Sequence, residues 1–275
     1  MARAEAGPDF VEALARGLDV IAAFRPGRPP MSLSEVAAET GLARPTARRF
    51  LLTLQRLGYV RAEATGYSLT PRVLELGTAY VQSLGLWDVA RPHMEALVAR
   101  TNESTSIAQL DGSDVVYVAR VAVPKIVTLS VSIGTRFPAL QTSLGKVLLA
   151  ALGDDEVEEV LAQPSRSGLV PVWVPDRQER RAVLREVRAR GWALSDEQLA
   201  RGIRSVAAPL RDGAGRVVAA MNVNAHAGET SLERLTQEHL PALLAAAADV
   251  SADFARLATL PRVVASVAEP AAAPG

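Results

Sequence analysis

Apolar residues in the first part of the chain recur at the three- and four-residue spacing of helices. One such stretch covers residues 10–24, and the proline-rich sequence that follows ends it. Ser32 and Glu35 have the spacing of a capping box, which predicts a short helix over residues 33–40. A glycine turn then leads into a longer helix over residues 44–57, which again ends at a glycine. The pattern predicts three helices, with a tight turn between the second and the third.

Residues 59–69 change to a two-residue alternation around Thr65–Gly66, which predicts a β-hairpin. Three helices followed by a hairpin are typical of a winged helix-turn-helix, so we expect residues 1–70 to form one such domain. The third helix has an apolar face for packing on the other two, formed by Phe50, Leu51, Leu54 and Leu57.

The third helix and its flanks concentrate positive charge. Residues 41–61 contain five arginines and no acid, in a chain whose formal net charge is zero. Side chains near the start of such a helix meet base edges in helix-turn-helix proteins, and arginine can bind guanine through two hydrogen bonds. A solvated basic helix is the alternative interpretation. The candidate DNA-binding residues are Ser34, Arg44, Pro45, Thr46, Arg48, Arg49 and Arg61.

Residues 71–89 combine leucines and valines with small residues and predict a helix that connects two domains. The apolar face of this helix is larger than an isolated linker should expose to water. We therefore expect the linker helix to pack on a second copy of itself.

Beyond residue 90 the pattern becomes a mixture of strands and helices. Hairpins are predicted around Asp111–Gly112 and Asp212–Gly213, and a further strand is predicted over residues 125–132. Several helical stretches separate them. A long helix over residues 231–257 closes the pattern, and Pro241 is a point where it can kink.

Adjacent hairpins with helices on one or both faces favour an antiparallel α+β domain over residues 90–260, of the kind that encloses a small ligand. The Ala- and Pro-rich residues 261–275 are predicted to be a disordered tail.

Composition narrows the class of protein. The 275 residues are 49% hydrophobic and 22% charged, which provides for about two domains with sizeable cores. Because there is no cysteine, disulfides, thiolate metal sites and cysteine nucleophiles are excluded. The N-terminal residues lack the apolar run of a signal peptide, and no uncharged apolar stretch approaches the ~20 residues of a membrane span. We expect a cytoplasmic globular protein with no membrane partner.

Motifs for catalysis or cofactor binding are weak. Gly145–Lys146 resembles the end of a phosphate-binding loop, but Leu140 and Val147 stand where a glycine and a hydroxyl residue belong. The three histidines are not at metal-ligand spacing, and no arrangement for nucleophilic catalysis is present. No cofactor, metal site or catalytic residue is predicted.

Four segments together resemble the IclR-type transcriptional regulators: FVEALARGLDVIAAF, LSEVAAETGLARPTARRFLLTLQRLGYV, FPALQTSLGKVLLAAL and LARGIRSVAAPLRDGAGRVVAAMNV. The resemblance runs from about residue 9 to residue 260, with the motifs in the family's order. ARRFLLTL and DVVYVARVAVPKI are most similar to the branch that regulates aromatic-acid catabolism, the protocatechuate and 4-hydroxybenzoate regulators. The resemblance implies a winged-helix DNA-binding domain, a linker helix and a GAF-like effector-binding domain, which act as a dimer or a dimer of dimers.

The resemblance also implies effector-binding positions, where this sequence matches the family's pattern: Thr142, Ser143, Leu144, Asp196, Ser205, Asn222 and Asn224. Ser143 either caps the helix that begins there or donates its hydroxyl to a ligand. Asn222 and Asn224, where other members often have serine, alternate on a strand and share one face, and their amides suit ring hydroxyls. Arg120 is either a counter-charge for a carboxylate or an outward-facing arginine.

These observations favour a ligand-responsive transcriptional regulator. It is expected to bind promoter DNA and a small aromatic carboxylate with a ring hydroxyl, such as 4-hydroxybenzoate or protocatechuate. Two alternatives stay open: a small-molecule enzyme built on the GAF-like domain, and a constitutive DNA-binding regulator without an effector.

Overall fold

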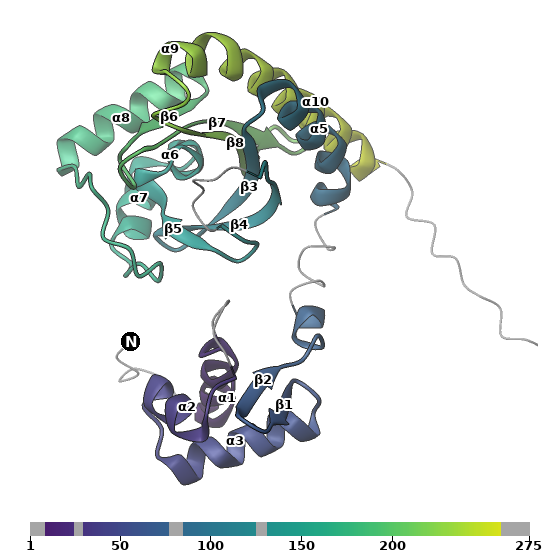
Figure 1. The fold of residues 1–275 in the computed structure, drawn as a ribbon. Coiled ribbons are helices and arrows are strands. Elements are labelled where there is room, and N and C mark those ends of the chain that lie inside the picture. The colour runs from purple at the N-terminus through teal and green to yellow at the C-terminus, as the bar shows by residue number, and fades with distance from the viewer. Residues whose placement is uncertain (1–8, 25–29, 77–84, 125–130, 260–275) are drawn as a thin grey trace, which may run out of the picture. The chain divides into compact units, whose positions relative to one another are not determined.

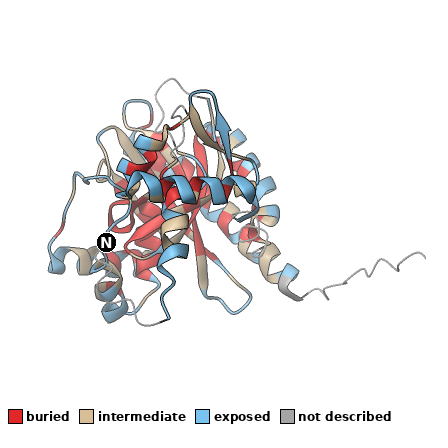
Figure 2. Ribbon diagram, turned by 90° about the horizontal axis from the view of Figure 1, so that it is seen from below, coloured by how far each residue is buried: buried red, intermediate tan, exposed pale blue. Residues whose placement is uncertain are grey.

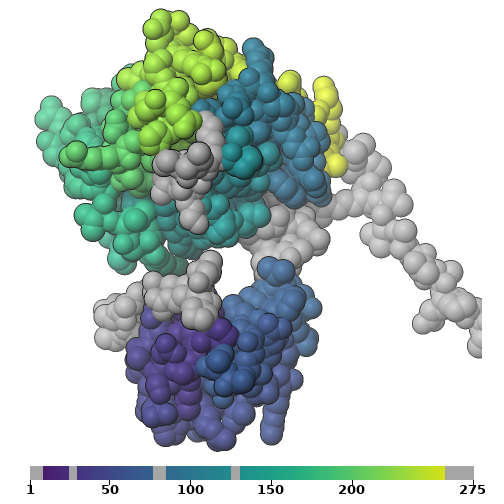
Figure 3. Space-filling model, in the orientation of Figure 1, coloured from purple at the N-terminus to yellow at the C-terminus, as the bar shows by residue number. Residues whose placement is uncertain are grey.

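A computed structural model describes residues 9–24, 30–76, 85–124 and 131–259. Contacts between residues divide the chain into two compact units, 1–83 and 84–275, and each is described by itself (Figures 1 and 3).

The first unit contains the three predicted helices and the predicted hairpin. The helices are α1 (Glu12–Ala22), α2 (Leu33–Thr40) and α3 (Arg44–Arg56). The antiparallel hairpin consists of β1 (Val60–Glu63) and β2 (Gly66–Leu69). Because β1 ends opposite the first residue of β2, the turn lies one position earlier than the sequence predicts. The unit is a winged helix-turn-helix, as expected.

The start of α2 confirms the predicted capping box. The backbone N–H of Glu35 donates to the Ser32 hydroxyl at 3.3 Å, and the backbone N–H of Ser32 donates to the Glu35 carboxylate at 2.7 Å. Both bonds satisfy N–H groups that have no partner inside the helix. The sequence therefore specifies the beginning of this helix locally.

The core of the first unit lies between α1, α2, α3 and β1. It is formed by Val20, Met31, Val36, Leu51, Leu54 and Val60. Leu57 was predicted to belong to this core, and that prediction is wrong: its side chain is 51% exposed. The reason is that Leu57 lies at the C-cap of α3, where the chain leaves the helix. On α1, Leu14 and Leu18 are 63% and 54% exposed, so this helix keeps an apolar face outside the core.

The second unit is built on a six-stranded antiparallel sheet with the order β5-β4-β3-β8-β7-β6 (Figure 1). The two predicted hairpins form its centre, because β3 pairs with both β4 and β8. The strands are β3 (Ser104–Asp111), β4 (Asp114–Val121), β5 (Arg136–Pro138), β6 (Ala193–Asp196), β7 (Ile203–Arg211) and β8 (Val217–His226).

Helices cover both faces of this sheet, and the buried residues gather between the helices and the sheet (Figure 2). On one face lie α5 (Leu86–Thr101) and α10 (Leu240–Thr259). On the other face lie α6 (Ser143–Ala150), α7 (Asp154–Leu161) and α8 (Arg177–Arg190). The α+β class predicted from the sequence is confirmed.

Several predicted elements differ from the observed ones. The short strands β5 and β6 have no clear signal in the sequence. The long closing helix is irregular: α9 (Leu232–Arg234) passes through a π-helical turn (Leu235–His239) before α10. The predicted linker helix does not run unbroken to residue 89, because α5 begins after Gly85, which has a φ of 60°. Residues 77–84 of that helix, and most of the strand predicted over residues 125–132, lie outside the described residues.

None of the helices in the described ranges combines the length and hydropathy that crossing a bilayer requires.

Candidate functional site

The first turns of α3 form a cationic surface on the first unit. Arg44, Arg48 and Arg49 are exposed, and none of them forms an ion pair or a side-chain hydrogen bond with a described residue. Pro45 in the first turn costs no hydrogen bond, because the N–H groups there have no intrahelical acceptor. Thr46 lies beside them, half-buried. The buried side of the same helix, at Leu51 and Leu54, anchors this surface to the core.

Two other predicted DNA-binding residues have different surroundings. Ser34 is exposed in the first turn of α2. Arg61 lies on β1, where its Nε donates to the Glu63 carboxylate at 2.9 Å and to the Ser68 hydroxyl at 3.0 Å. A hydrogen bond from the Ser68 hydroxyl, followed by the one from Arg61, holds the pKa of the Glu63 carboxyl below its usual range. The charge of Arg61 is therefore already partly compensated within the hairpin.

The second unit contains a small cavity between the sheet and the start of α6. The cavity lies on the face of the sheet that α6 covers, and residues of five strands reach it because antiparallel pairing aligns them in rows. One row pairs Ser195, Ser205 and Asn224, and the next contains Asn222. The lining consists of Tyr117, Val131, Phe137, Gln141, Thr142, Ser195, Leu199, Ile203, Ser205, Asn222 and Asn224.

The start of α6 brings Thr142 to this cavity. Thr142 is the N-cap, and its hydroxyl oxygen accepts from the backbone N–H of Gly145 at 2.9 Å. Capping, one of the two roles left open for Ser143, is therefore wrong, because Ser143 lies one position inside the helix. Its hydroxyl instead shares a 2.7 Å hydrogen bond with that of Ser205. Leu144 is fully buried in the core under α6 and does not line the cavity.

The polar groups of the cavity divide into paired and unpaired ones. The amide oxygen of Asn222 accepts from the backbone N–H of Ser106 at 3.0 Å. The hydroxyl of Ser195 donates to the carbonyl oxygen of Gln141 at 2.7 Å. In contrast, the side-chain amide of Asn224 and the hydroxyl of Tyr117 have no hydrogen-bond partner among the described residues. These two groups are available to a ligand.

Tyr117 and Phe137 supply aromatic surface to the cavity. Their ring centroids are 5.4 Å apart with the rings at 86°, an edge-to-face arrangement that fixes both side chains. Burial raises the pKa of Tyr117 to about 12, so its hydroxyl stays protonated and can donate a hydrogen bond at neutral pH. Sequence alternation alone does not identify either ring as part of the site.

Arg120 lies in the row of Ser106 and Asn222, on the same face of the sheet. It is half-buried, and its Nη1 donates to the Ser106 hydroxyl at 2.9 Å. No described carboxylate pairs with it, and burial lowers the pKa of its guanidinium. Arg120 is thus a poorly solvated cation beside the cavity, although it does not line it.

Asp196 was predicted to bind the effector, and the structure contradicts this prediction. Its carboxylate lies 3.0 Å from the Nε of Arg204 on the opposite face of the sheet. The neighbouring residue Ser195 lines the cavity instead. The physical reason is the two-residue alternation of a strand, which places adjacent side chains on opposite faces.

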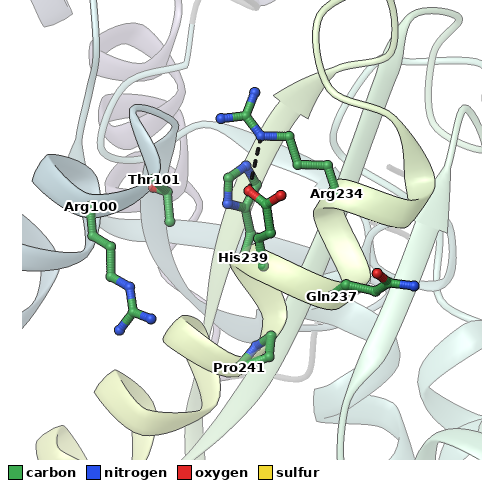
Figure 4. A pocket seen from close by; sticks show the side chains of 7 residues that line it. Arg100, Thr101, Arg234, Gln237, His239 and Pro241 are labelled. Carbon is green, nitrogen blue, oxygen red and sulfur yellow. Dashed lines mark hydrogen bonds and ion pairs between the residues drawn. The ribbon is translucent and has the colours of Figure 1, made fainter.

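A second hollow lies between the end of α5 and the π-helical turn (Figure 4). Arg234 and Glu238 form an ion pair of 3.3 Å within it. Its described lining contains no Phe, Tyr, Trp, Leu, Ile or Val side chain, so it offers an aromatic ring little apolar surface. The lining residues are Arg100, Thr101, Arg234, Gln237, Glu238, His239 and Pro241.

No three His, Asp or Glu side chains in the described part of the chain are close enough to hold a metal ion. His93, one of the three histidines, instead lies 2.9 Å from the Asp253 carboxylate.

Comparison with known proteins identifies both units. Residues 13–64 match the family profile described as IclR helix-turn-helix domain, and residues 78–252 match the profile described as Bacterial transcriptional regulator IclR C-terminal.

Two relatives and one solved structure are similar along most of the chain. The Pca regulon regulatory protein of Pseudomonas putida is 38% identical over 88% of this chain and 84% of its own. The p-hydroxybenzoate hydroxylase transcriptional activator of Acinetobacter baylyi is 34% identical over 86% of this chain and 89% of its own. The crystal structure of an IclR homolog complexed with 4-hydroxybenzoate, from Microbacterium hydrocarbonoxydans, is 27% identical and has a TM-score of 0.77. It covers 89% of this chain and 99% of its own.

The relatives are named as transcriptional regulators and not as enzymes, which agrees with the winged helix and its cationic α3. Both the resemblance to the IclR-type regulators and the similarity to their aromatic-acid branch are confirmed. With a helix-turn-helix profile over the first unit and an effector-domain profile over most of the second, the chain belongs to the IclR family of bacterial transcriptional regulators.

Proposed function

We propose that this regulator controls genes of aromatic-acid catabolism and that its effector is a small aromatic carboxylate with a ring hydroxyl. 4-Hydroxybenzoate and protocatechuate are the first candidates. Support comes from the relatives, one of which is named for a Pca regulon and one for p-hydroxybenzoate hydroxylase. A structural neighbour is complexed with 4-hydroxybenzoate itself.

The observation that carries this proposal is the pair of unpartnered polar groups between apolar walls. The Tyr117 hydroxyl donates, and the Asn224 amide both donates and accepts, so together they suit a ring hydroxyl. Phe137 and Leu199 provide apolar surface for the ring. A site that hydrogen-bonds a substrate hydroxyl rejects analogues without it, because its own polar groups are then buried unpaired.

The carboxylate of the ligand is assigned to the side of the cavity where α6 begins. The start of α6, next to Thr142, has backbone N–H groups without intrahelical acceptors and the positive end of the helix dipole. Arg120 adds a cation with no described acidic partner nearby. Ser143 and Ser205 act through their mutual hydrogen bond, which holds the helix start against β7.

The exposed arginines of α3 are assigned to DNA. One of Arg48 and Arg49 contacts base edges and the other contacts phosphate, with Arg44, Pro45 and Thr46 beside them at the helix start. Ser34 and Arg61 are secondary contacts with the backbone, and Arg61 must first give up part of its bond to Glu63. Since its target is the genome, the protein acts in the cytoplasm.

A homodimer, or a dimer of dimers, is part of the proposal. One winged helix contacts too few base pairs to select a promoter, so two copies act together. The exposed apolar face of α1, with Leu14 and Leu18, suits a second copy of the same helix. In the linker, Leu74 and Leu76 are 69% and 52% exposed and are a second candidate surface for the same contact.

The test is a thermal-shift series with benzoate, 4-hydroxybenzoate and protocatechuate, with affinity for promoter DNA measured for each ligand that binds. A ligand at 100 times its Kd stabilises the native state by ~2.7 kcal/mol. We expect the hydroxylated acids to stabilise the protein and to change its DNA affinity. Equal binding of benzoate removes the role given to Tyr117 and Asn224. Binding without any change in DNA affinity favours the constitutive regulator instead.

Substitutions in the cavity and in the second hollow show which of the two binds the ligand. Tyr117→Phe and Asn224→Leu remove groups that have no hydrogen-bond partner among the described residues, so both variants should fold normally. Each variant should bind 4-hydroxybenzoate about tenfold more weakly, because one lost hydrogen bond costs ~1.4 kcal/mol of binding free energy. The affinity for benzoate should not change. Gln237→Leu, in the second hollow, is the matched control and should change neither. Loss of the response in the control alone would assign the ligand to the second hollow.

A further inference from the structure

Lys146 is a cation in an unusual position for this chain. Of thirty basic residues, twenty-eight are arginine and only Lys125 and Lys146 are lysine. Lys146 lies on α6, one helical turn after the cavity-lining Thr142, and is only 2% exposed. Lysine is rarely buried to this extent unless an acid pairs with it. No carboxylate among the described residues forms an ion pair with Lys146.

The ammonium of Lys146 is held by neutral groups from two segments. Its Nζ donates to the carbonyl oxygen of Leu194 at 2.7 Å and to the side-chain oxygen of Gln198. It also lies 5.1 Å from the centroid of the Trp173 ring, within the range of a cation–π interaction. A single side chain of α6 therefore contacts β6, the β6–β7 connection and the loop that contains Trp173.

These contacts continue into the wall of the cavity. The backbone N–H of Trp173 donates to the carbonyl oxygen of Gln198 at 3.1 Å, and the Gln141 side-chain amide donates to the Trp173 carbonyl oxygen at 3.0 Å. Gln141 accepts in turn from the Ser195 hydroxyl. Gln141, Ser195 and Leu199, the residue after Gln198, all line the cavity. Lys146 thus closes a ring of hydrogen bonds around one wall of the site.

The wall that Lys146 holds is not a regular strand. Glu197 has a φ of 53°, a conformation that costs free energy for a residue with a side chain. Its carboxylate accepts from the backbone N–H of Gly202 at 2.8 Å, which closes the connection on itself. Backbone hydrogen bonds to Ile203 and Ala227 hold the ends of this connection. Lys146 and Trp173 add contacts at Gln198, between those ends.

The charge of Lys146 costs folding free energy. Burial first and the charge of Arg190 second lower its pKa to about 8, and Glu186 opposes part of this shift. The other charged groups nearby are engaged elsewhere: Glu179 accepts from the Trp173 indole N–H at 3.2 Å, and Asp196 pairs with Arg204 across the sheet. A residue that lowers the stability of the fold while it holds the wall of a binding site is retained for its function in binding.

We propose that Lys146 is a positioning residue whose ammonium holds the Gln198–Leu199 wall and Trp173 in the ligand-binding arrangement, so that effector affinity depends on the protonation of Lys146. This inference rests on the proposed effector site. When Lys146 is neutral, its hydrogen bonds lose their charge assistance, which is about half of their strength. The wall then spends less time in the binding arrangement, and the apparent affinity falls in proportion.

Linkage fixes the sign of the effect. If the protonated form binds the ligand better, the ligand must raise the pKa of Lys146 by the same free energy. Affinity is then highest below about pH 8 and falls as the pH rises through the pKa of the free protein. A rise of one pKa unit on binding corresponds to a loss of about tenfold in affinity at high pH.

The first measurement uses the scarcity of lysine. The full-length protein labelled with carbon-13 at the lysine ε position has two signals, and Lys125→Arg identifies the one from Lys146. We expect the Lys146 signal to titrate near pH 8 without ligand and at higher pH with 4-hydroxybenzoate. An identical titration with and without bound ligand overturns the proposal.

The second measurement compares the affinity for 4-hydroxybenzoate near pH 7 and near pH 9.5 in the wild type, Lys146→Met and Lys146→Arg. The phenol of the ligand itself ionises in this range, so the ratio of wild type to variant is the readout. We expect several-fold greater loss in the wild type than in either variant, because neither methionine nor arginine titrates there. If all three proteins lose affinity in parallel, the role of Lys146 is refuted and the proposed effector site stands. If the wild type does not bind 4-hydroxybenzoate near pH 7, both the effector site and this inference are refuted.

Discussion

At the residue scale, Gly145 is the most confined of the described glycines in the second unit. A Cβ atom at this residue would lie 2.0 Å from the carbonyl oxygen of Ala139, so any side chain forces the backbone of α6 away from the preceding turn. Helix propensity favours alanine over glycine by ~1 kcal/mol, but overpacking against backbone costs ~1–3 kcal/mol or more and decides the outcome. Gly145→Ala should therefore lower the midpoint of urea unfolding and weaken effector binding. Gly213→Ala, whose Cβ has 3.7 Å to its nearest neighbour, is the control and should do neither.

A second prediction at this scale concerns the stability cost of Lys146. Its pKa is about 8 in the folded protein and lies near 10.5 in the unfolded chain. Between these values the unfolded state binds more protons, so the free energy of unfolding rises with pH across this window. Lys146→Met removes this rise and should stabilise the protein near pH 7 by on the order of 1–3 kcal/mol. Urea unfolding of both proteins from about pH 7 to pH 10 measures the difference, and a less stable variant at neutral pH would show that Lys146 stabilises the fold.

At the scale of the element, α3 separates anchoring from recognition. Its buried face holds Leu51 and Leu54, and its exposed start carries arginines with no described partner, so changes at Arg48 and Arg49 should not affect folding. A lost phosphate contact weakens all DNA sequences alike and reduces the salt dependence of log K by about one unit, whereas a lost base contact costs ~1–3 kcal/mol of discrimination. We expect Arg48→Ala and Arg49→Ala to differ in this way in fluorescence anisotropy. Arg56→Ala, at the other end of the helix, is the control. A folded double variant that binds its operator normally would exclude α3 as the reader.

At the scale of the whole molecule, the proposed assembly depends on the apolar face of α1. Glutamate at Leu14 and Leu18 places two charges on residues that are already more than half exposed, so each chain should still fold. In a dimer the same charges would meet their copies, which is unfavourable. The double variant Leu14→Glu, Leu18→Glu should therefore weaken self-association in sedimentation velocity and lower DNA affinity by at least tenfold. Val170→Glu, at a 92% exposed residue of the effector unit, should leave both unchanged. A wild type that is monomeric at micromolar concentration, with undiminished DNA affinity, would refute the dimer.

The sequence by itself determined the elements whose signals are local. The capping box at Ser32, the basic start of α3 and the hairpins at Asp111–Gly112 and Asp212–Gly213 are all confirmed, because helix caps, tight turns and hydrophobic periodicity depend on residues that are close in the chain. The family resemblance also came from continuous motifs. Through those motifs the resemblance pointed to Thr142, which lines the cavity.

Only the tertiary structure decided which side chains share the cavity. Alternation along β4 would place Tyr117 and Arg120 on opposite faces, but a bulge, where β3 shifts register between Ile107 and Ala108, brings both to the face that α6 covers. The pairing of β6 with β7 likewise selected Ser195 over Asp196. The burial of Lys146 depends on segments about fifty residues away. Strand register and helix packing are set by contacts between segments that are distant in the chain, and local periodicity carries no information about them.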